Sequence, residues 1–130
     1  MALTLAELHS LLSAQDELTV MQEGDAVLIS HEDGVDAFVT VEGDQILVES
    51  LLCKVDQVRD QNALNAQILR THKTVFPLTT LGISTIGNDE YYAAFGALSA
   101  HSKPESVLIE VETLFLNIEG MLEFYGTYLA

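Results

Sequence analysis

Ser99, His101, Ser102 and Glu105 fall within seven residues of the stretch "FGALSAHSKPESVLIEVETL" at positions 95–114. Serine beside histidine is the pair that hydrolases use as nucleophile and general base. However, "GALSA" lacks the second glycine of the Gly-x-Ser-x-Gly turn that presents a nucleophilic serine. Triad members also meet through the fold and not through adjacency in sequence. The spacing of Ser102 and Glu105 instead predicts a helix capping box, with Ser99 and His101 in the connector before it.

The remaining reactive side chains follow no known site pattern. The histidines at positions 9, 31, 72 and 101 share no metal-ligand spacing, and the single cysteine has no neighbouring ligand. Asp33, Asp36 and Asp44 belong to turns and do not match a calcium loop. The glycines form neither a dinucleotide motif nor a phosphate-binding loop. We therefore predict no catalytic residue, no cofactor and no metal site, and we expect Cys53 to be a small core residue of a strand.

Composition and charge set the class of protein. The 130 residues are 48% hydrophobic, so we expect one α+β domain over residues 1–130. Five basic residues stand against 20 acidic ones, a net charge of −15 that excludes a nucleic-acid partner. The start "MALTLAELHSLL" lacks the basic region of a targeting segment, and no apolar run reaches the ~18 residues of a membrane span. The lone cysteine fits a reducing compartment, so we expect a cytoplasmic protein without direct membrane insertion.

The basic residues are unevenly distributed. Four of the five fall within residues 54–73, where two aspartates oppose them. This cluster has two interpretations, which are an internal contact with acidic elements and a docking spot for an acidic ligand.

Hydrophobic periodicity and turn residues predict the elements that position these side chains. Residues 4–14 form a helix face that begins with a Thr4–Glu7 capping box. A second helix, capped by Asp56 or Asp60, extends to about Phe76, since Pro77 prevents continuation. One side of this helix is expected to carry its apolar residues, Ala63, Leu64, Ile68 and Leu69. The β-prone runs, separated by Gly-containing turns, are 18–22, 26–30, 37–41, 45–55, 78–86 and 90–98. The chain is therefore predicted to be α+β, an antiparallel sheet with the order α-β-β-β(-β)-α-β-β-α.

The long apolar run from 105 to 129 predicts a third helix with an unusually wide apolar surface. Its main seam repeats like a heptad and consists of Val107, Val111, Leu114, Ile118, Met121, Tyr125 and Tyr128. One helix face packed on a sheet needs a stripe of about 100°, and this surface is wider. The surplus predicts a homodimer; the alternative is that one chain covers both faces. Gly120 and Gly126 favour a kink or an early end.

We expect the contact with a second copy or a partner to lie on this helix. The expected interface residues are Val111, Leu114, Phe115, Leu116, Ile118 and Leu122.

Two segments resemble the YjfI-like family of small bacterial cytoplasmic proteins. They are "VESLLCKVDQVRDQNALNAQILRTHKTVFPLTTLGIS" at 48–84 and "FGALSAHSKPESVLIEVETLFLNIEG" at 95–120. The resemblance implies no catalytic residue. Because family members are often encoded beside a homologue of phage shock protein A, a coiled-coil protein of the inner-membrane surface, it implies a partner of that type.

The order of elements is similar to that of class I type III secretion chaperones and YbjN-like proteins. This resemblance implies a dimeric α+β domain that binds extended or amphipathic segments of other proteins. The predicted function is therefore a non-enzymatic, dimeric protein-binding module of the bacterial cytoplasm, chaperone-like or an adaptor. The alternatives are a regulator of a phage-shock-protein-A-like membrane-stress system and, less favoured, an enzyme with an unrecognised site.

Overall fold

The computed structural model describes residues 2–129 and contains four α-helices, a short 3-10 helix and six strands. The helices are α1 (Leu5–Ser13), α2 (Gln61–Val75), α3 (Pro104–Phe124) and α4 (Gly126–Leu129), with the 3-10 helix η1 at Val55–Gln57. The strands are β1 (Leu18–Glu23), β2 (Ala26–His31), β3 (Asp36–Glu42), β4 (Gln45–Lys54), β5 (Thr80–Ile86) and β6 (Asp89–Ser99). The predicted order of elements is confirmed, with four strands in the first group.

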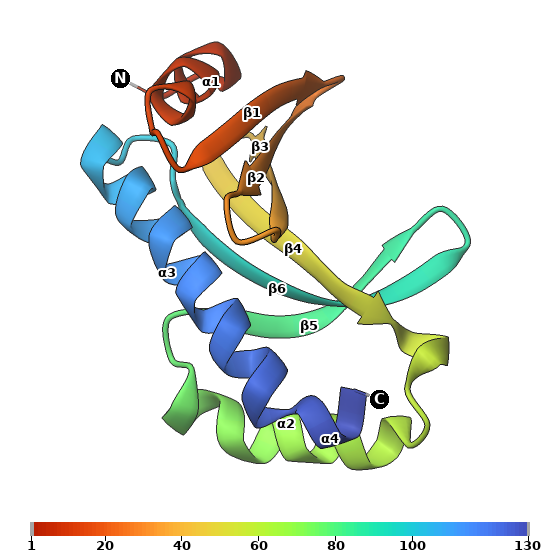
Figure 1. The fold of residues 1–130 in the computed structure, drawn as a ribbon. Coiled ribbons are helices and arrows are strands. Elements are labelled where there is room, and N and C mark those ends of the chain that lie inside the picture. Colours follow the sequence, from red (N-terminus) through yellow and green to blue (C-terminus); the bar gives the residue numbers. More distant parts are fainter. Residues whose placement is uncertain (1, 130) are drawn as a thin grey trace.

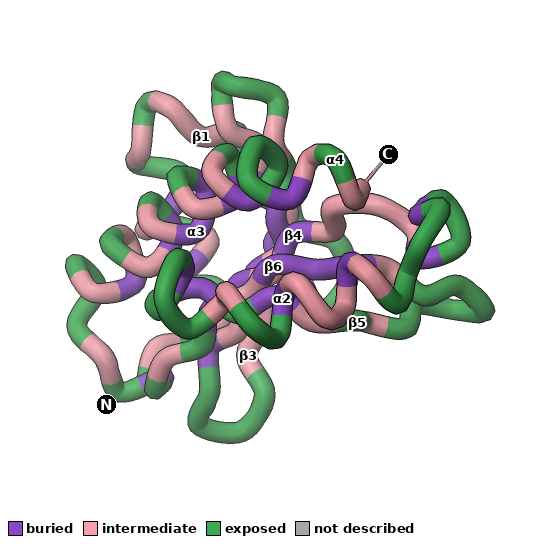
Figure 2. Tube along the Cα trace, turned by 90° about the horizontal axis from the view of Figure 1, so that it is seen from below, coloured by how far each residue is buried: buried purple, intermediate pink, exposed green. Residues whose placement is uncertain are grey.

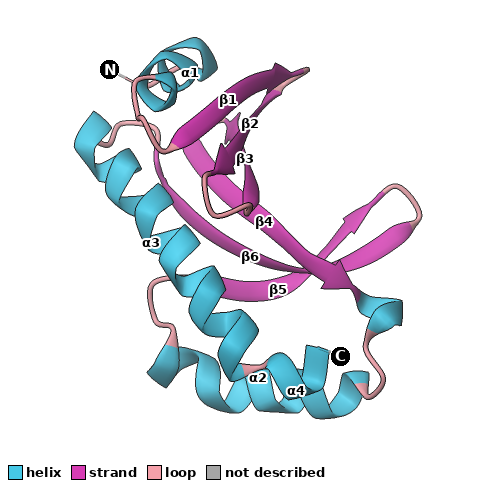
Figure 3. Cartoon of the chain, in the orientation of Figure 1, coloured by secondary structure: helices cyan, strands magenta, loops and turns pink. Residues whose placement is uncertain are grey.

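All six strands join one antiparallel sheet in the order β1-β2-β3-β4-β6-β5 (Figure 3). Tight turns connect the hairpins, and Gly43 and Gly87 adopt positive φ values of 59° and 63° there, a conformation that glycine accepts without strain. The β5–β6 hairpin returns to pair β6 with β4, and β5 forms an outer edge. This arrangement leaves two edge strands, β1 and β5.

The helices gather on one side of the curved sheet, and α3 crosses the face over β4 and β6 (Figure 1). Alternate residues of the strands face these helices and are fully buried, among them Val27, Val39, Ile46 and Val48. Burial is concentrated in central β4 and β6, while the turns are exposed (Figure 2). The core therefore lies between this sheet face and the helices.

Local signals explain where two of the helices begin and end. The Thr4 hydroxyl accepts from the Glu7 backbone nitrogen at 3.2 Å and completes the predicted capping box. The Asp60 carboxylate accepts from the Ala63 backbone nitrogen at 3.0 Å, and α2 ends at Val75, before a proline. Both predicted helix starts are thus confirmed.

The predicted capping box of α3 is wrong. Its N-cap is Lys103, because Pro104 occupies the first helical position and holds the preceding residue in the extended conformation of an N-cap. Ser102 instead closes a turn, donating its backbone N–H to the Ser99 carbonyl at 3.0 Å. α3 ends at Phe124, so the expected interruption near Gly126 is confirmed.

No helix within residues 2–129 has the length and apolar character needed to cross a bilayer.

Candidate protein-binding surfaces

The six residues expected to form an interface on α3 divide into two groups. Val111, Leu114, Phe115 and Ile118 are buried against the sheet of the same chain. Leu116 and Leu122 point outward, and Leu116 is 70% exposed. The chain itself therefore covers four of the six expected interface residues and leaves Leu116 and Leu122 open. Ile109 and Phe124 of the same helix are exposed as well.

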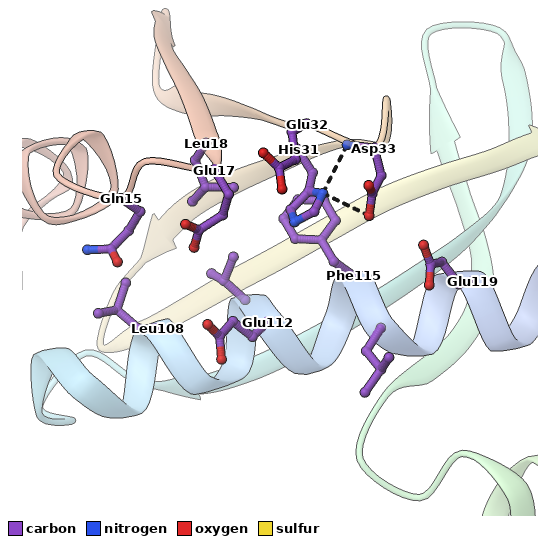
Figure 4. A pocket seen from close by; sticks show the side chains of 12 residues that line it. Gln15, Glu17, Leu18, His31, Glu32, Asp33, Leu108, Glu112, Phe115 and Glu119 are labelled. Carbon is purple, nitrogen blue, oxygen red and sulfur yellow. Dashed lines mark hydrogen bonds and ion pairs between the residues drawn. The ribbon is translucent and has the colours of Figure 1, made fainter.

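A groove of about 440 Å³ runs between α3 and the segments that flank β1 and β2. We call it the acidic groove. Its lining residues are Gln15, Glu17, Leu18, His31, Glu32, Asp33, Leu108, Val111, Glu112, Phe115, Leu116 and Glu119. Figure 4 shows carboxylates on both walls: Glu17, Glu32 and Asp33 descend from the strand side, and Glu112 and Glu119 rise from α3. The groove therefore combines an apolar floor with an acidic rim.

The wall and the floor meet at an aromatic contact. The rings of His31 and Phe115 are tilted by 42° with centroids 5.0 Å apart. Nδ1 of His31 lies 3.1 Å from the backbone nitrogen of Asp33 and 3.2 Å from its carboxylate (Figure 4). These contacts fix the imidazole at the turn after β2, so one face of the groove presents a rigid ring pair.

A second groove, of about 320 Å³, lies between α2 and β5. Its lining contains no charged residue, and we call it the uncharged groove: Asn65, Ile68, Leu69, Leu81, Gly82, Ile83 and Tyr92. Leu69 is 84% exposed, although the sequence placed it on the buried side of α2. That expectation is wrong because α2 turns Leu64 and Ile68 toward the core, and the next position lies about 100° further around the helix.

Polar contacts hold α2 in place behind this groove. The Tyr92 hydroxyl donates to Asn65 Oδ1 at 2.6 Å, and the hydroxyls of Thr71 and Tyr125 lie 2.8 Å apart. Burial, with smaller contributions from Cys53 and Glu90, raises the pKa of Tyr92, so its hydroxyl keeps the proton that it donates. The sheet and the α3–α4 junction thereby fix the position of α2.

The opposite face of the sheet carries none of the described helices (Figure 1). Leu28, Phe38, Leu47 and Phe95 lie on this face and are half-buried. Side chains from neighbouring strands cover these four residues, whereas Met21 of β1, which pairs with Leu28 on the same face, is 55% exposed.

The residues considered for catalysis do not come together as a site. The Ser99 hydroxyl accepts from the backbone nitrogen of His101 at 3.1 Å, and Nε2 of that histidine lies 3.7 Å from Asp44. Cys53 is half-buried beside a register shift in β4, rather than fully in the core, and burial raises the pKa of its thiol. Within residues 2–129, no three His, Cys, Asp or Glu side chains are arranged to hold a metal ion.

Among residues 2–129, the basic cluster makes one ion pair. Nζ of Lys54 lies 3.5 Å from the Asp89 carboxylate, next to the turn of the β5–β6 hairpin, and this partner raises the pKa of the lysine. Arg59, Arg70 and Lys73 are exposed. For Lys54, this ion pair agrees with the interpretation that the basic residues contact acidic elements of the same chain.

The sequence reasoning missed both grooves. Glu112 and Glu119 are seven residues apart and next to apolar positions, which places them along one side of α3. That spacing is a usable signal. The opposite wall comes from residues 15–33, which are too far from α3 in the sequence for any local pattern to connect them.

Comparison with known proteins gives relatives over almost the whole chain. The uncharacterized protein YjfI of Escherichia coli strain K12 is 29% identical over 116 residues, which is 88% of this chain and 86% of YjfI. This similarity confirms the resemblance to YjfI-like proteins.

Solved structures share the fold. The structure of YbjN from E. coli has a TM-score of 0.74 at 17% identity and covers 98% of this chain and 94% of its own. A chain of the ExsC–ExsE complex gives 0.64 at 14% identity, covering 95% and 96%. A chain of the HopA1–SchA chaperone–effector complex gives 0.62 at 15%, covering 92% and 90%.

These likenesses confirm the predicted α+β, secretion-chaperone-like fold. The family described as "Uncharacterized protein conserved in bacteria (DUF2170)" matches residues 1–129. The chain therefore belongs to the DUF2170 family of bacterial proteins.

Proposed function

We propose that the protein is a non-enzymatic protein-binding module of the bacterial cytoplasm, a chaperone-like or adaptor protein that works as a homodimer. The fold supports a binding role, because chains of this fold have been crystallised in a chaperone–effector complex and in the ExsC–ExsE complex. The observation that carries the proposal is the exposed apolar surface at the uncharged groove.

This surface has the properties of a contact between two copies. β5 pairs on one side only, so its outer edge presents unpaired backbone groups, and Ile83 on it is 47% exposed. Leu69 projects from α2 beside it. Further exposed apolar side chains lie on the same elements or in the loop between them: Val75, Leu78 and Ile86. Full burial of an exposed side chain of this size is worth ~1.5 to 3 kcal/mol, and the half-exposed ones among them gain a part of that.

The charge of the chain favours this location over α3. Two copies with a net charge of −15 each repel one another, and an interface without carboxylates keeps that repulsion small. Leu116 and Leu122 lie among Glu112, Glu119 and Glu123, so a second copy placed there would bring like charges together. We therefore place the dimer contact at α2 and β5 rather than at Leu116 and Leu122.

Light scattering coupled to size exclusion tests this proposal. At about ten micromolar the mass should be roughly twice the 14.2 kDa of one chain. Leu69→Glu should give the single-chain mass, because it buries a carboxylate in the contact. Leu116→Glu is the matched control, since it makes the same change at another exposed leucine, and it should leave the dimer intact.

A wild-type protein of single-chain mass would overturn the dimer. If Leu116→Glu dissociated the protein and Leu69→Glu did not, the contact would instead lie on α3.

A role in a membrane-stress system, through a coiled-coil partner of phage-shock-protein-A type, is the second candidate function. The similarity to YjfI supports it, through the gene neighbourhood that the family resemblance implies. A pull-down with the purified neighbouring protein at low salt should recover a complex. Recovery of nothing under these conditions would contradict this role.

A further inference from the structure

We propose that the acidic groove binds an extended segment of a partner protein in which arginine or lysine alternates with apolar residues. The inference rests on the proposed protein-binding function, to which it adds the site and the chemistry of the bound segment. The groove is distinct from the uncharged groove, and the two share no lining residue.

The charge of the lining determines the sign of the occupant. Five of the 12 lining residues are Asp or Glu, and none is Lys or Arg. Among residues 2–129, the ion pair between a lysine and a carboxylate joins Lys54 to Asp89, which lie outside this groove. Inside the groove, the carboxylate of Asp33 pairs with the imidazole of His31. Carboxylates on facing walls repel one another in the free protein, and a cation between them converts that repulsion into attraction.

The floor of the groove favours an organic cation over a metal ion. Leu108 and Leu116 from α3 and Leu18 from β1 offer apolar surface that a hydrated metal ion would leave in contact with water, and the nearly buried Val111 and Phe115 lie beneath it. Lysine and arginine bury their aliphatic stems on such surface while their charged ends reach outward. A guanidinium group also stacks on aromatic rings, and the His31–Phe115 ring pair stands beside the rim carboxylates.

The length of the groove favours a peptide over a compact amine. Along α3 the lining runs from Leu108 to Glu119, which at 1.5 Å per residue is about 16 Å. An extended chain advances about 3.3 Å per residue, so the groove accommodates about five residues. Alternating side chains of such a segment point to opposite sides, which suits a floor that is apolar and walls that are acidic.

The test measures fluorescence anisotropy with labelled synthetic peptides of about six residues. The probe peptide alternates arginine and leucine. One comparison peptide alternates glutamate and leucine, and another alternates arginine and serine. We expect binding of the arginine–leucine peptide, at least about tenfold weaker binding of the arginine–serine peptide and no binding of the glutamate–leucine peptide.

Protein variants locate the binding site. Glu112→Gln with Glu119→Gln removes two rim carboxylates and should weaken binding of the arginine–leucine peptide about fivefold to tenfold. Glu105→Gln with Glu123→Gln is the matched control, because it removes the same charge from exposed positions of the same helix outside the groove. The control should change the affinity less than about twofold.

Three results would overturn the inference. Equal weakening by both double variants would mean that the peptide responds only to the overall negative charge. Equal binding of the two arginine peptides would mean that the apolar floor is not used. Displacement of the peptide by an equimolar amount of Mg²⁺ would assign the groove to a metal ion.

The outcome is separable from that of the proposed dimer. A wild-type dimer that fails to bind the arginine–leucine peptide removes this inference and leaves the dimer standing. A monomer that binds the peptide through the rim carboxylates removes the dimer and leaves this inference standing.

Discussion

The two grooves of the protein are built in opposite ways. The floor of the acidic groove includes core residues, and Val111 and Phe115 are almost completely buried there. The uncharged groove is formed by side chains that protrude from α2 and β5, such as Leu69 and Ile83. In the first groove, five carboxylates stand around the apolar surface, and in the second there is none.

The difference separates two kinds of recognition. Apolar groups that protrude without charge favour contact with a similar surface, and that contact depends on the area removed from water. Apolar groups recessed between charges of one sign favour a partner of opposite charge, and that contact weakens as salt screens it. A strongly acidic chain can thus bind itself at one surface and a cationic partner at the other.

The largest effect should come from shortening a floor residue of the acidic groove. Phe115→Ala removes a buried ring that packs on His31, and it should lower the free energy of unfolding by about 3 kcal/mol. Leu69→Ala should change it by about 0.5 kcal/mol or less in dilute protein, where the chain is monomeric, because this side chain is exposed. Urea unfolding measures both values. An equal decrease in the free energy of unfolding for the two variants would contradict the contrast between the recessed acidic groove and the protruding uncharged groove.

An intermediate effect should appear when salt is varied. From about 50 mM to about 500 mM NaCl, the affinity of the arginine–leucine peptide should fall about tenfold, because the screening length shrinks from about 14 Å to about 4 Å. The mass from light scattering should stay the same over this range, since the uncharged groove has no charge to screen. A dimer that dissociates as salt is added would contradict the uncharged contact, because salt screens the repulsion between two copies of net charge −15.

The smallest effect concerns a carboxylate of α3 outside the acidic groove. Glu110 lies over Gly96 of β6, where a Cβ atom would come within 2.5 Å of Glu110 Oε2. Desolvation raises the pKa of Glu110 in the folded protein. This group therefore supports the folded state at pH values below its ordinary pKa, and that contribution is lost as the pH rises through the raised value.

Glu110→Gln removes this dependence. At about pH 7 the variant should be more stable than the wild type by about 0.5 kcal/mol, a small gain because water still reaches the carboxylate. Urea unfolding between about pH 4 and about pH 7 measures the difference, which should shrink toward the acidic end. Glu123→Gln, at an exposed position of α3, controls for net charge. A variant less stable than the wild type at neutral pH would contradict the assignment.

Local signals in the sequence predicted most of the fold. Alternation and turn glycines are properties of a few neighbouring residues, so the strands and the hairpins were predictable. Thr4 and Asp60 cap the helices that they were expected to cap. The cap of α3 was misassigned by one residue, because a serine three positions before a glutamate matches the capping pattern even when Pro104 takes the first helical position.

The candidate sites were largely not predictable. The apolar width of α3 is visible in the sequence, but which part of it faces the same chain depends on how the sheet curves around it. Val111 and Leu116 look alike in a hydrophobic pattern, and only the fold shows that one is buried and the other exposed. The acidic rim joins the segments that flank β1 and β2 to α3, and Leu69 is exposed because of the orientation of α2.

The position of β6 between β4 and β5 affects the order in which the chain can fold during synthesis. The meander from β1 to β4 pairs neighbours in sequence, so it can form as soon as residue 54 has emerged. The outer edge of β4 then stays unpaired until residues 89–99 have emerged. The helix α3, which covers the core-facing side of the sheet, emerges later still. Until then the nascent meander exposes an unpaired strand and the apolar face that becomes the core, the two features that make a partly folded chain prone to aggregation.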